Sequence, residues 1–259
     1  MHNITEMIWI EMRKAIRSRM PIWTALASLF MPLGMGILIF ASKNPEISHK
    51  LGLISVKADL VAYAATDWAS YIGLTSLVIA AGGFFFFILV VSWVFGREFV
   101  DGTLKDLLAV PIQRASIILA KFIVIAIWSV MLTLVILVFS LIMGALINLP
   151  GFSREVIIDG SIHLVATALL VMVVSTPFAL IASIGRGYLL PLGVAVLMLM
   201  GTNIMAVAGW GETFPWAVPG LFAQGKTILP PISYVIVFIT GVLGIIATYF
   251  WWKYADQNR

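Results

Sequence analysis

Residues 220–227 read GLFAQGKT and match the pattern G-x-x-x-x-G-K-[ST] of phosphate-binding loops in nucleotide-binding proteins. Such a loop holds phosphate when a strand precedes it and a helix follows it, because backbone N–H groups and the helix N-terminus must converge on the anion. No strand pattern precedes the motif here, and the Pro-Pro pair at 230–231 ends any helix soon after it. We therefore interpret the match as a chance resemblance and Lys226 as an interfacial charge.

Other residue types that carry catalysis are scarce. The chain has no Cys, and its three His residues fall in different segments, so neither thiol chemistry nor a metal-ligand pattern is indicated. The long apolar stretches contain essentially no carboxylate, which a membrane-embedded enzyme or an ion-coupled carrier would need. The sequence therefore predicts a protein that is not an enzyme and has no cofactor or metal site of its own.

The composition is that of an integral membrane protein. Of the 259 residues, 61% are hydrophobic and 11% are charged, whereas a soluble domain has roughly 25% charged residues. The net charge of +4 could suggest nucleic acid, but the basic residues are distributed around apolar segments and argue against a nucleic-acid partner.

The apolar residues form six stretches long enough to cross a bilayer as helices. They cover about 21–41, 71–95, 122–147, 161–183, 188–208 and 231–252. Because backbone polar groups in lipid must be paired within the segment, we expect an all-α fold, with 1–259 forming one transmembrane domain. Pro32, Pro177 and Pro191 are expected either to kink spans one, four and five or to be tolerated without a kink.

The basic residues indicate the orientation. If the N-terminus is cytoplasmic, eleven of the 16 Lys and Arg residues lie on the cytoplasmic side, as the positive-inside rule requires. Six spans then return the C-terminus to the same side. The segments 42–70 and 209–230 are external in this topology, and the sequence assigns no role to them.

Residues 1–20 are predicted to form a helix that lies on the cytoplasmic membrane surface. Apolar residues recur every four positions, which makes one apolar stripe: Ile4, Ile8, Met12 and Ile16. Basic residues are placed to meet anionic lipid headgroups: Arg13, Lys14, Arg17 and Arg19. The alternative is that these charges act only as a positive-inside anchor.

The cytoplasmic segment 95–121 predicts a short helix between spans two and three. Thr103 and Asp106 have the spacing of an N-cap pair, so the helix should begin at 104 and stop before Pro111. Leu104, Leu107 and Leu108 share one apolar face, and Lys105 and Asp106 flank it. Such a helix suits docking into a groove on a soluble partner; an ordinary interfacial loop remains the alternative.

This segment resembles a known family. The order Glu98, Gly102-Thr103, Pro111, Arg114 and Lys121 is similar to the E…GT…P…R…K signature of ABC-2 type transporter permeases. The stretch FPWAVP at 214–219 is similar to the outer segment of small bacterial members near the bacitracin and lantibiotic immunity permeases. The six spans, the N-terminal helix and the chain length agree with this resemblance.

The resemblance implies a division of labour between subunits. Two copies of a separate ATPase would bind ATP and Mg²⁺, and this chain would pair with a second permease, identical or related. The ATPase contact would fall on Glu98, Gly102, Thr103, Leu104, Lys105, Leu107 and Leu108. The implied function is export of a hydrophobic or amphipathic peptide, antibiotic or lipid across the cytoplasmic membrane. A membrane sensor or scaffold that transports nothing is the alternative, and the substrate itself cannot be read from the sequence.

Overall fold

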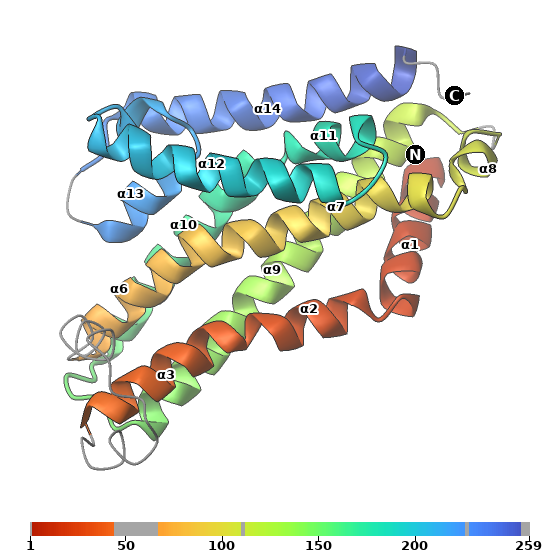
Figure 1. Cartoon of the computed structure of the whole chain (residues 1–259). Helices are drawn as coiled ribbons and strands as arrows, with labels where there is room; N and C mark the ends of the chain where they lie inside the picture. The colour runs from red at the N-terminus through yellow and green to blue at the C-terminus, as the bar shows by residue number, and fades with distance from the viewer. Residues whose placement is uncertain (1, 44–66, 110–111, 226–227, 255–259) are drawn as a thin grey trace.

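The computed structural model describes residues 2–43, 67–109, 112–225 and 228–254. Within these ranges the secondary structure is helical, with no strand. Figure 1 shows a bundle of long helices with short helices at its two ends. The predicted all-α membrane fold is confirmed.

Six spans are present among the described residues, as the sequence predicted. The first three are α2 (Met20–Ser28) with α3 (Phe30–Lys43), α6 (Trp68–Val78) with the π-helical turn η1 (Ile79–Gly83) and α7 (Phe84–Val100), and α9 (Arg114–Leu146). The last three are α10 (Arg154–Ser175) with α11 (Phe178–Ile184), α12 (Leu189–Val207) and α14 (Pro231–Tyr254). The short elements are α1 (His2–Arg17), α8 (Leu104–Ala109), η2 (Gly211–Thr213) and α13 (Val218–Gln224).

The second and third spans are longer helices than the sequence predicted. The hydropathy of the sequence ended span two near 95 and began span three near 122, whereas α7 continues to Val100 and α9 begins at Arg114. Charged residues ended the apolar windows, but charges that are paired inside the protein do not stop a helix. As a consequence, Glu98 and Lys121 lie on the long helices and not in a loop.

The three prolines behave differently. Pro177 lies at the break between α10 and α11, where the Thr176 hydroxyl donates to the Gly241 carbonyl at 2.9 Å. Pro32 lies in the first turn of α3, just after the α2–α3 junction. Pro191 lies in the first turn of α12, where proline needs no kink, and that helix continues unbroken.

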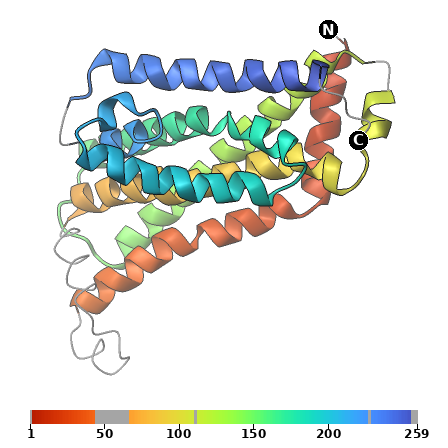
Figure 2. The same cartoon turned by 45° about the horizontal axis from the view of Figure 1, so that its top comes forward.

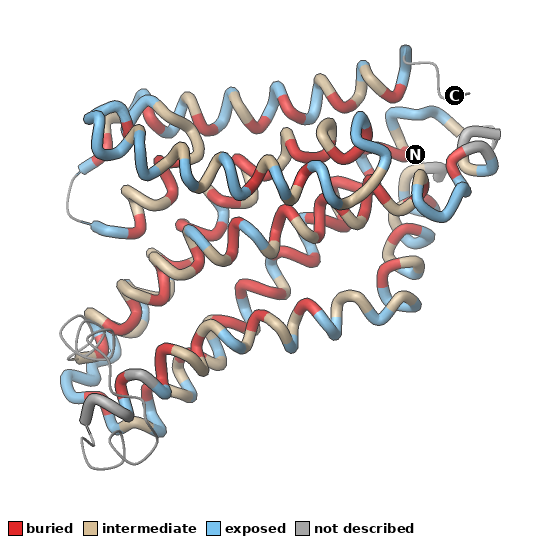
Figure 3. Tube along the Cα trace, viewed as in Figure 1, coloured by how far each residue is buried: buried red, intermediate tan, exposed pale blue. Residues whose placement is uncertain are grey.

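The core is centred on α7, which packs against α9, α10, α11 and α12. Buried residues gather on these facing surfaces (Figure 3), with Phe87, Ile88 and Val90 almost completely enclosed. On α12, in contrast, only Pro191 and Ala195 are buried. Its outward apolar side chains are those of a helix that faces lipid or another membrane helix.

The two ends of the bundle carry different elements. In Figures 1 and 2, α1, α8 and both chain ends lie at one end, and α13 lies at the opposite end. At the α13 end, the Trp216 indole N–H donates to the Val174 carbonyl at 3.0 Å, and Phe222 stacks on His163 with ring centroids 4.6 Å apart. This arrangement places the termini and the segment after span two on the same side, as six spans require.

The buried face of α1 differs from the predicted apolar stripe. Met7, Glu11 and Ala15, spaced four residues apart, form the buried face, and α1 packs against α9. Ile16, a member of the predicted stripe, is 64% exposed. The periodicity was right, but the face is displaced because Glu11 finds charged partners inside the protein.

Candidate functional site

Four charged side chains from three helices form a closed cluster at the α8 end of the bundle. The Lys14 ammonium lies 2.8 Å from Glu11 Oε1 and 2.9 Å from Glu98 Oε1. The Lys121 ammonium lies 3.0 Å from Glu11 Oε2 and 3.1 Å from Glu98 Oε1. Each carboxylate therefore lies between two ammonium groups, and the two charges of each sign balance.

Lys121 is the most deeply buried member of this charge cluster. Its side chain is 0% exposed, and its ammonium also donates to the Val94 carbonyl at 3.0 Å. Three acceptors thus match the three donors of the lysine. A buried ammonium without such partners would be strongly unfavourable, so the position of Lys121 depends on the side chains of Glu11 and Glu98.

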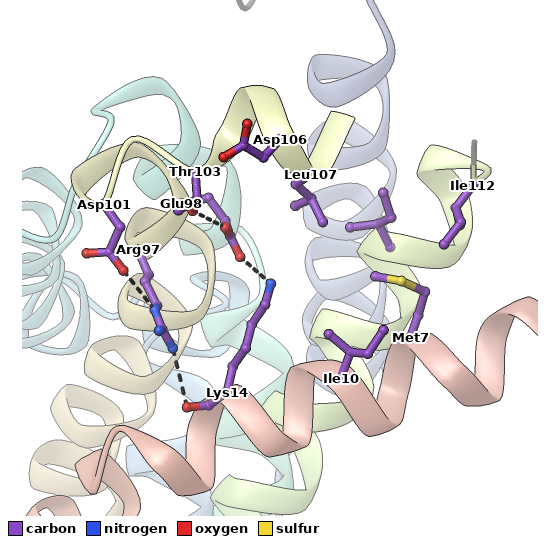
Figure 4. Close-up of a pocket in the computed structure, with 11 residues that line it drawn as sticks. Met7, Ile10, Lys14, Arg97, Glu98, Asp101, Thr103, Asp106, Leu107 and Ile112 are labelled. Carbon is purple, nitrogen blue, oxygen red and sulfur yellow. Dashed lines mark hydrogen bonds and ion pairs between the residues drawn. The ribbon is translucent and has the colours of Figure 1, made fainter. Parts of the chain in front are cut away.

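Lys14 occupies the solvent side of the charge cluster. Burial lowers the pKa of its ammonium, but the nearby carboxylates of Glu11 and Glu98 outweigh this effect, and the pKa lies above its ordinary value. Arg97 adds a link between helices, because its guanidinium donates to the Lys14 carbonyl at 3.3 Å and to Asp101 Oδ2 at 3.0 Å (Figure 4). These contacts tie α1 to the end of α7.

The turn from α7 into α8 is tied to the same cluster. The Thr103 hydroxyl donates to Glu98 Oε2 at 2.7 Å, so Glu98 contacts α1, α9 and the start of α8 at once. Gly102 precedes it with φ of +68°, a left-handed conformation that favours glycine. Gly96 is also required, because a Cβ there would lie 2.9 Å from the Gly187 backbone. Gly96 therefore permits a close approach of two backbones, and Gly102 permits a turn.

The short helix predicted at 104–110 is confirmed as α8, Leu104–Ala109. Its apolar side chains do not all face a partner as the sequence suggested. Leu104 is 7% exposed and belongs to the core of this subunit, and half-buried Leu107 packs against a cluster that contains Met7 and Ile117. Asp106 is exposed. The side chains of Lys105 and Leu108 lie outside the described residues.

A cavity of about 350 Å³ opens between α1, the α7–α8 turn and the start of α9 (Figure 4). Its wall is mixed, with Asp106 and Lys14 on one part and Met7, Ile10 and Leu107 on the other. Figure 4 shows these side chains converging from α1 and α8. The cavity could receive a polypeptide segment that carries both an apolar and a charged side chain.

The remaining basic residues named from the sequence have separate places. Arg114 donates to the carbonyls of Trp252 and Lys253 at 2.7 and 3.0 Å, and so satisfies the C-terminal end of α14. Arg13, Arg17 and Arg19 are exposed, whereas Lys14 is partly buried.

The phosphate-loop motif has the wrong structural setting. Its first five residues form the end of α13, and Gly225 ends that helix with φ of +62°. The negative C-terminal end of a helix therefore points toward the segment that would have to hold phosphate. Lys226 itself lies outside the described residues. Within the described ranges, no group of three or more metal-ligating side chains is present.

Sequence reasoning found Glu98 and Lys121 only as family signature residues and missed Glu11. The spacing could have revealed it, because Glu11 lies four residues after Met7 and four before Ala15, on the same face of a helix. The expectation that the spans carry essentially no charge is corrected at this end, where Glu98 and Lys121 lie on span helices. Their mutual pairing makes this burial possible.

Comparison with known proteins places this geometry in context. The sequence model of the ABC-2 family transporter protein matches residues 7–202, a range that contains the whole charge cluster. A bacitracin transport permease protein, BCRB, of Bacillus licheniformis is 28% identical over 171 residues, which cover 65% of this chain and 82% of that protein.

Proposed function

The chain belongs to the ABC-2 transporter family and is a transmembrane subunit of an ABC transporter, and from this premise we propose that it exports an amphipathic substrate using ATP hydrolysed by partner subunits. Two ATPase copies would bind at the α8 end, and a second permease would complete the pathway. We place this end in the cytoplasm, with both termini, and the α13 end outside.

The position of α8 carries this proposal. It protrudes at the same end as α1, next to a cavity that accepts both apolar and charged groups, and the charge cluster joins it to three other helices. A soluble subunit that contacts Asp106 would therefore act on Glu98 of span two and, through Glu98, on Lys121 of span three. Such a connection could convert movement of the ATPases into movement of the spans.

The described part of the spans supports a hydrophobic or amphipathic substrate. Ionisable residues of the spans, such as Glu98, Lys121 and Asp159, lie near the helix ends. The central parts of the spans are therefore apolar. The related permease is named for bacitracin transport. We therefore propose a substrate of the same chemical kind, with export as the direction.

Co-purification tests the partner contact. The subunit is expressed with its native ATPase partner, and variants Asp106→Arg and Leu107→Asp are compared by affinity purification. Fully burying one Leu is worth roughly 1.5–3 kcal/mol. Because Leu107 is already half-buried within the subunit, replacing it with a charge should weaken ATPase binding by about threefold to tenfold. Asp106→Arg reverses an exposed charge and leaves the charge cluster intact.

The matched control is Asp159→Arg, which reverses an exposed charge at the opposite end. It should retain the ATPase at the unmodified ratio and keep substrate-stimulated ATP hydrolysis. If both α8 variants also retain a full complement of ATPase and transport, α8 is not the contact. If the unmodified complex binds the ATPase but moves no substrate, a sensor or scaffold without transport becomes the better account.

A further inference from the structure

A second cavity, of about 450 Å³, shares the lining residues Ile10, Lys14 and Arg97 with the cavity beside α8. It is formed by α1 and the end of α7, and its lining is strongly basic: Trp9, Ile10, Arg13, Lys14, Arg17, Ser18 and Arg97. Four of its seven lining residues are cations, and none is a carboxylate. An anion is the ligand that this lining would attract.

Two of the four cations are already paired within the protein. Lys14 contacts Glu11 and Glu98, and Arg97 contacts Asp101. Arg13 and Arg17, one helical turn apart, have no carboxylate partner among the described residues. The guanidinium of Arg13 lies 4.6 Å from the Trp9 ring centroid, which limits its orientation. Arg13 and Arg17 therefore remain available to an external anion.

The apolar surface next to this basic cavity indicates the kind of anion. Span one begins at Met20, directly after α1 and its Arg17. Exposed apolar side chains then recur every four residues at Ile22, Leu26 and Phe30. A headgroup at the level of Arg17 would thus have an apolar helix surface beginning within two turns of it, where an acyl chain could lie.

We propose that the basic cavity binds the phosphate of one anionic phospholipid, held by Arg13 and Arg17. The guanidinium groups supply charge-assisted hydrogen bonds to the phosphate oxygens, and the exposed Trp9 ring contacts the glycerol region of the lipid. An acidic segment of a protein would match the charges but not the apolar row on span one. The observations therefore favour the lipid.

The lipid would also sit beside the charge cluster. Lys14 and Arg97 line both cavities, so a phosphate in the basic cavity would lie close to groups that hold α1 against α7. Binding would add an anion on the solvent side of Lys14 and strengthen the attachment of α1. Lipid binding at the basic cavity is a property of the single subunit and does not depend on the ATPase.

Native mass spectrometry of the purified subunit in neutral detergent tests the proposal. Phosphatidylglycerol, phosphatidylcholine with the same acyl chains, and soluble glycerol phosphate are titrated separately. Tight binding of one phosphatidylglycerol is expected, with much weaker binding of the other two. The double variant Arg13→Gln with Arg17→Gln should bind it roughly thirtyfold more weakly, from the typical contribution of each basic residue near a membrane surface.

The control variant Arg154→Gln with Lys253→Gln removes the same charge from exposed residues that do not line the cavity, and should bind normally. A double variant Arg13→Lys with Arg17→Lys keeps the charge and should retain binding within about threefold, with all melting temperatures compared. Three results would each overturn the proposal. They are an equal loss in the control, displacement of the lipid by glycerol phosphate at similar concentration, and unchanged lipid binding in the Gln variant.

Discussion

The short helices α8 and α13 lie at opposite ends of the bundle and are attached by different interactions. Thr103 at the start of α8 bonds to Glu98, which is held in turn by two lysines. α13 is held by the Phe222 ring against His163 and by the adjacent Trp216 indole. The first attachment is directional and charged, and the second depends mainly on aromatic packing.

This difference fits two mechanical roles. Ion pairs change partners over short distances, so a charged attachment suits an end that must respond to a soluble subunit. Aromatic packing resists displacement without needing an exact hydrogen-bond geometry. We therefore expect changes at the charged end to alter coupling and changes at the aromatic end to alter stability alone.

The largest effect is expected for Lys121→Met. Methionine fills a similar volume but leaves Glu11 and Glu98 buried with only Lys14 between them. Breaking a buried ion pair from one side costs about 3–5 kcal/mol. The melting temperature in detergent should fall strongly, and the control Arg154→Met, at an exposed position of the other end, should change it little. Equal melting temperatures for the two variants would show that the charge cluster is not a stabilising centre.

A smaller loss is expected for Phe222→Ala at the aromatic end. The ring is half-buried and contacts both His163 and Tyr234, so its removal should cost roughly 1.5–3 kcal/mol. ATP hydrolysis per folded complex should stay normal when it is measured below the melting temperature. Loss of substrate-stimulated ATP hydrolysis in this variant would contradict the proposed difference between the two ends.

The next effect in size is expected for Thr103→Val, which keeps the shape and removes the hydroxyl bonded to Glu98. Because Thr103 is exposed, the stability cost should be only about 0.5–1.5 kcal/mol. Coupling should be reduced more than stability. The ATPase should remain bound, but less substrate should be transported for each ATP hydrolysed. Thr103→Ser restores the donor and should restore transport; failure of that rescue would argue against the hydrogen bond.

The smallest effect is expected for Asp101→Asn. The Arg97–Asp101 pair is a surface pair one helical turn apart, with the two side chains 28% and 44% exposed. Such pairs contribute about 0.3–0.5 kcal/mol. Chemical unfolding should therefore show a change near the limit of measurement. A loss above about 1.5 kcal/mol would show that the charged end includes more of α7 than the buried charge cluster.

The fold was largely predictable because each span repeats an apolar signal over about 20 residues. The charge cluster was not, since its four members come from positions 11, 14, 98 and 121. Hydropathy placed Glu98 and Lys121 just outside their spans, and it placed Glu11 and Lys14 on a separate surface helix. Sequence reasoning also assigned Leu104 to the contact with a partner. The amphipathic pattern of α8 shows that one face is apolar, but only packing shows that part of this face belongs to the subunit's own core.

We propose that the ATPase contacts α8 and that α13 lies across the membrane from it. The native chain has no Cys, so single cysteines can be introduced cleanly as Asp106→Cys and Asp159→Cys, both at exposed positions. A short thiol-to-amine cross-linker is then added to the assembled transporter in inverted membrane vesicles. We expect a cross-link between the cysteine at 106 and the ATPase, and no cross-link to the ATPase from the cysteine at 159. A cross-link from position 159, or none from position 106 in an assembled and active complex, would contradict it.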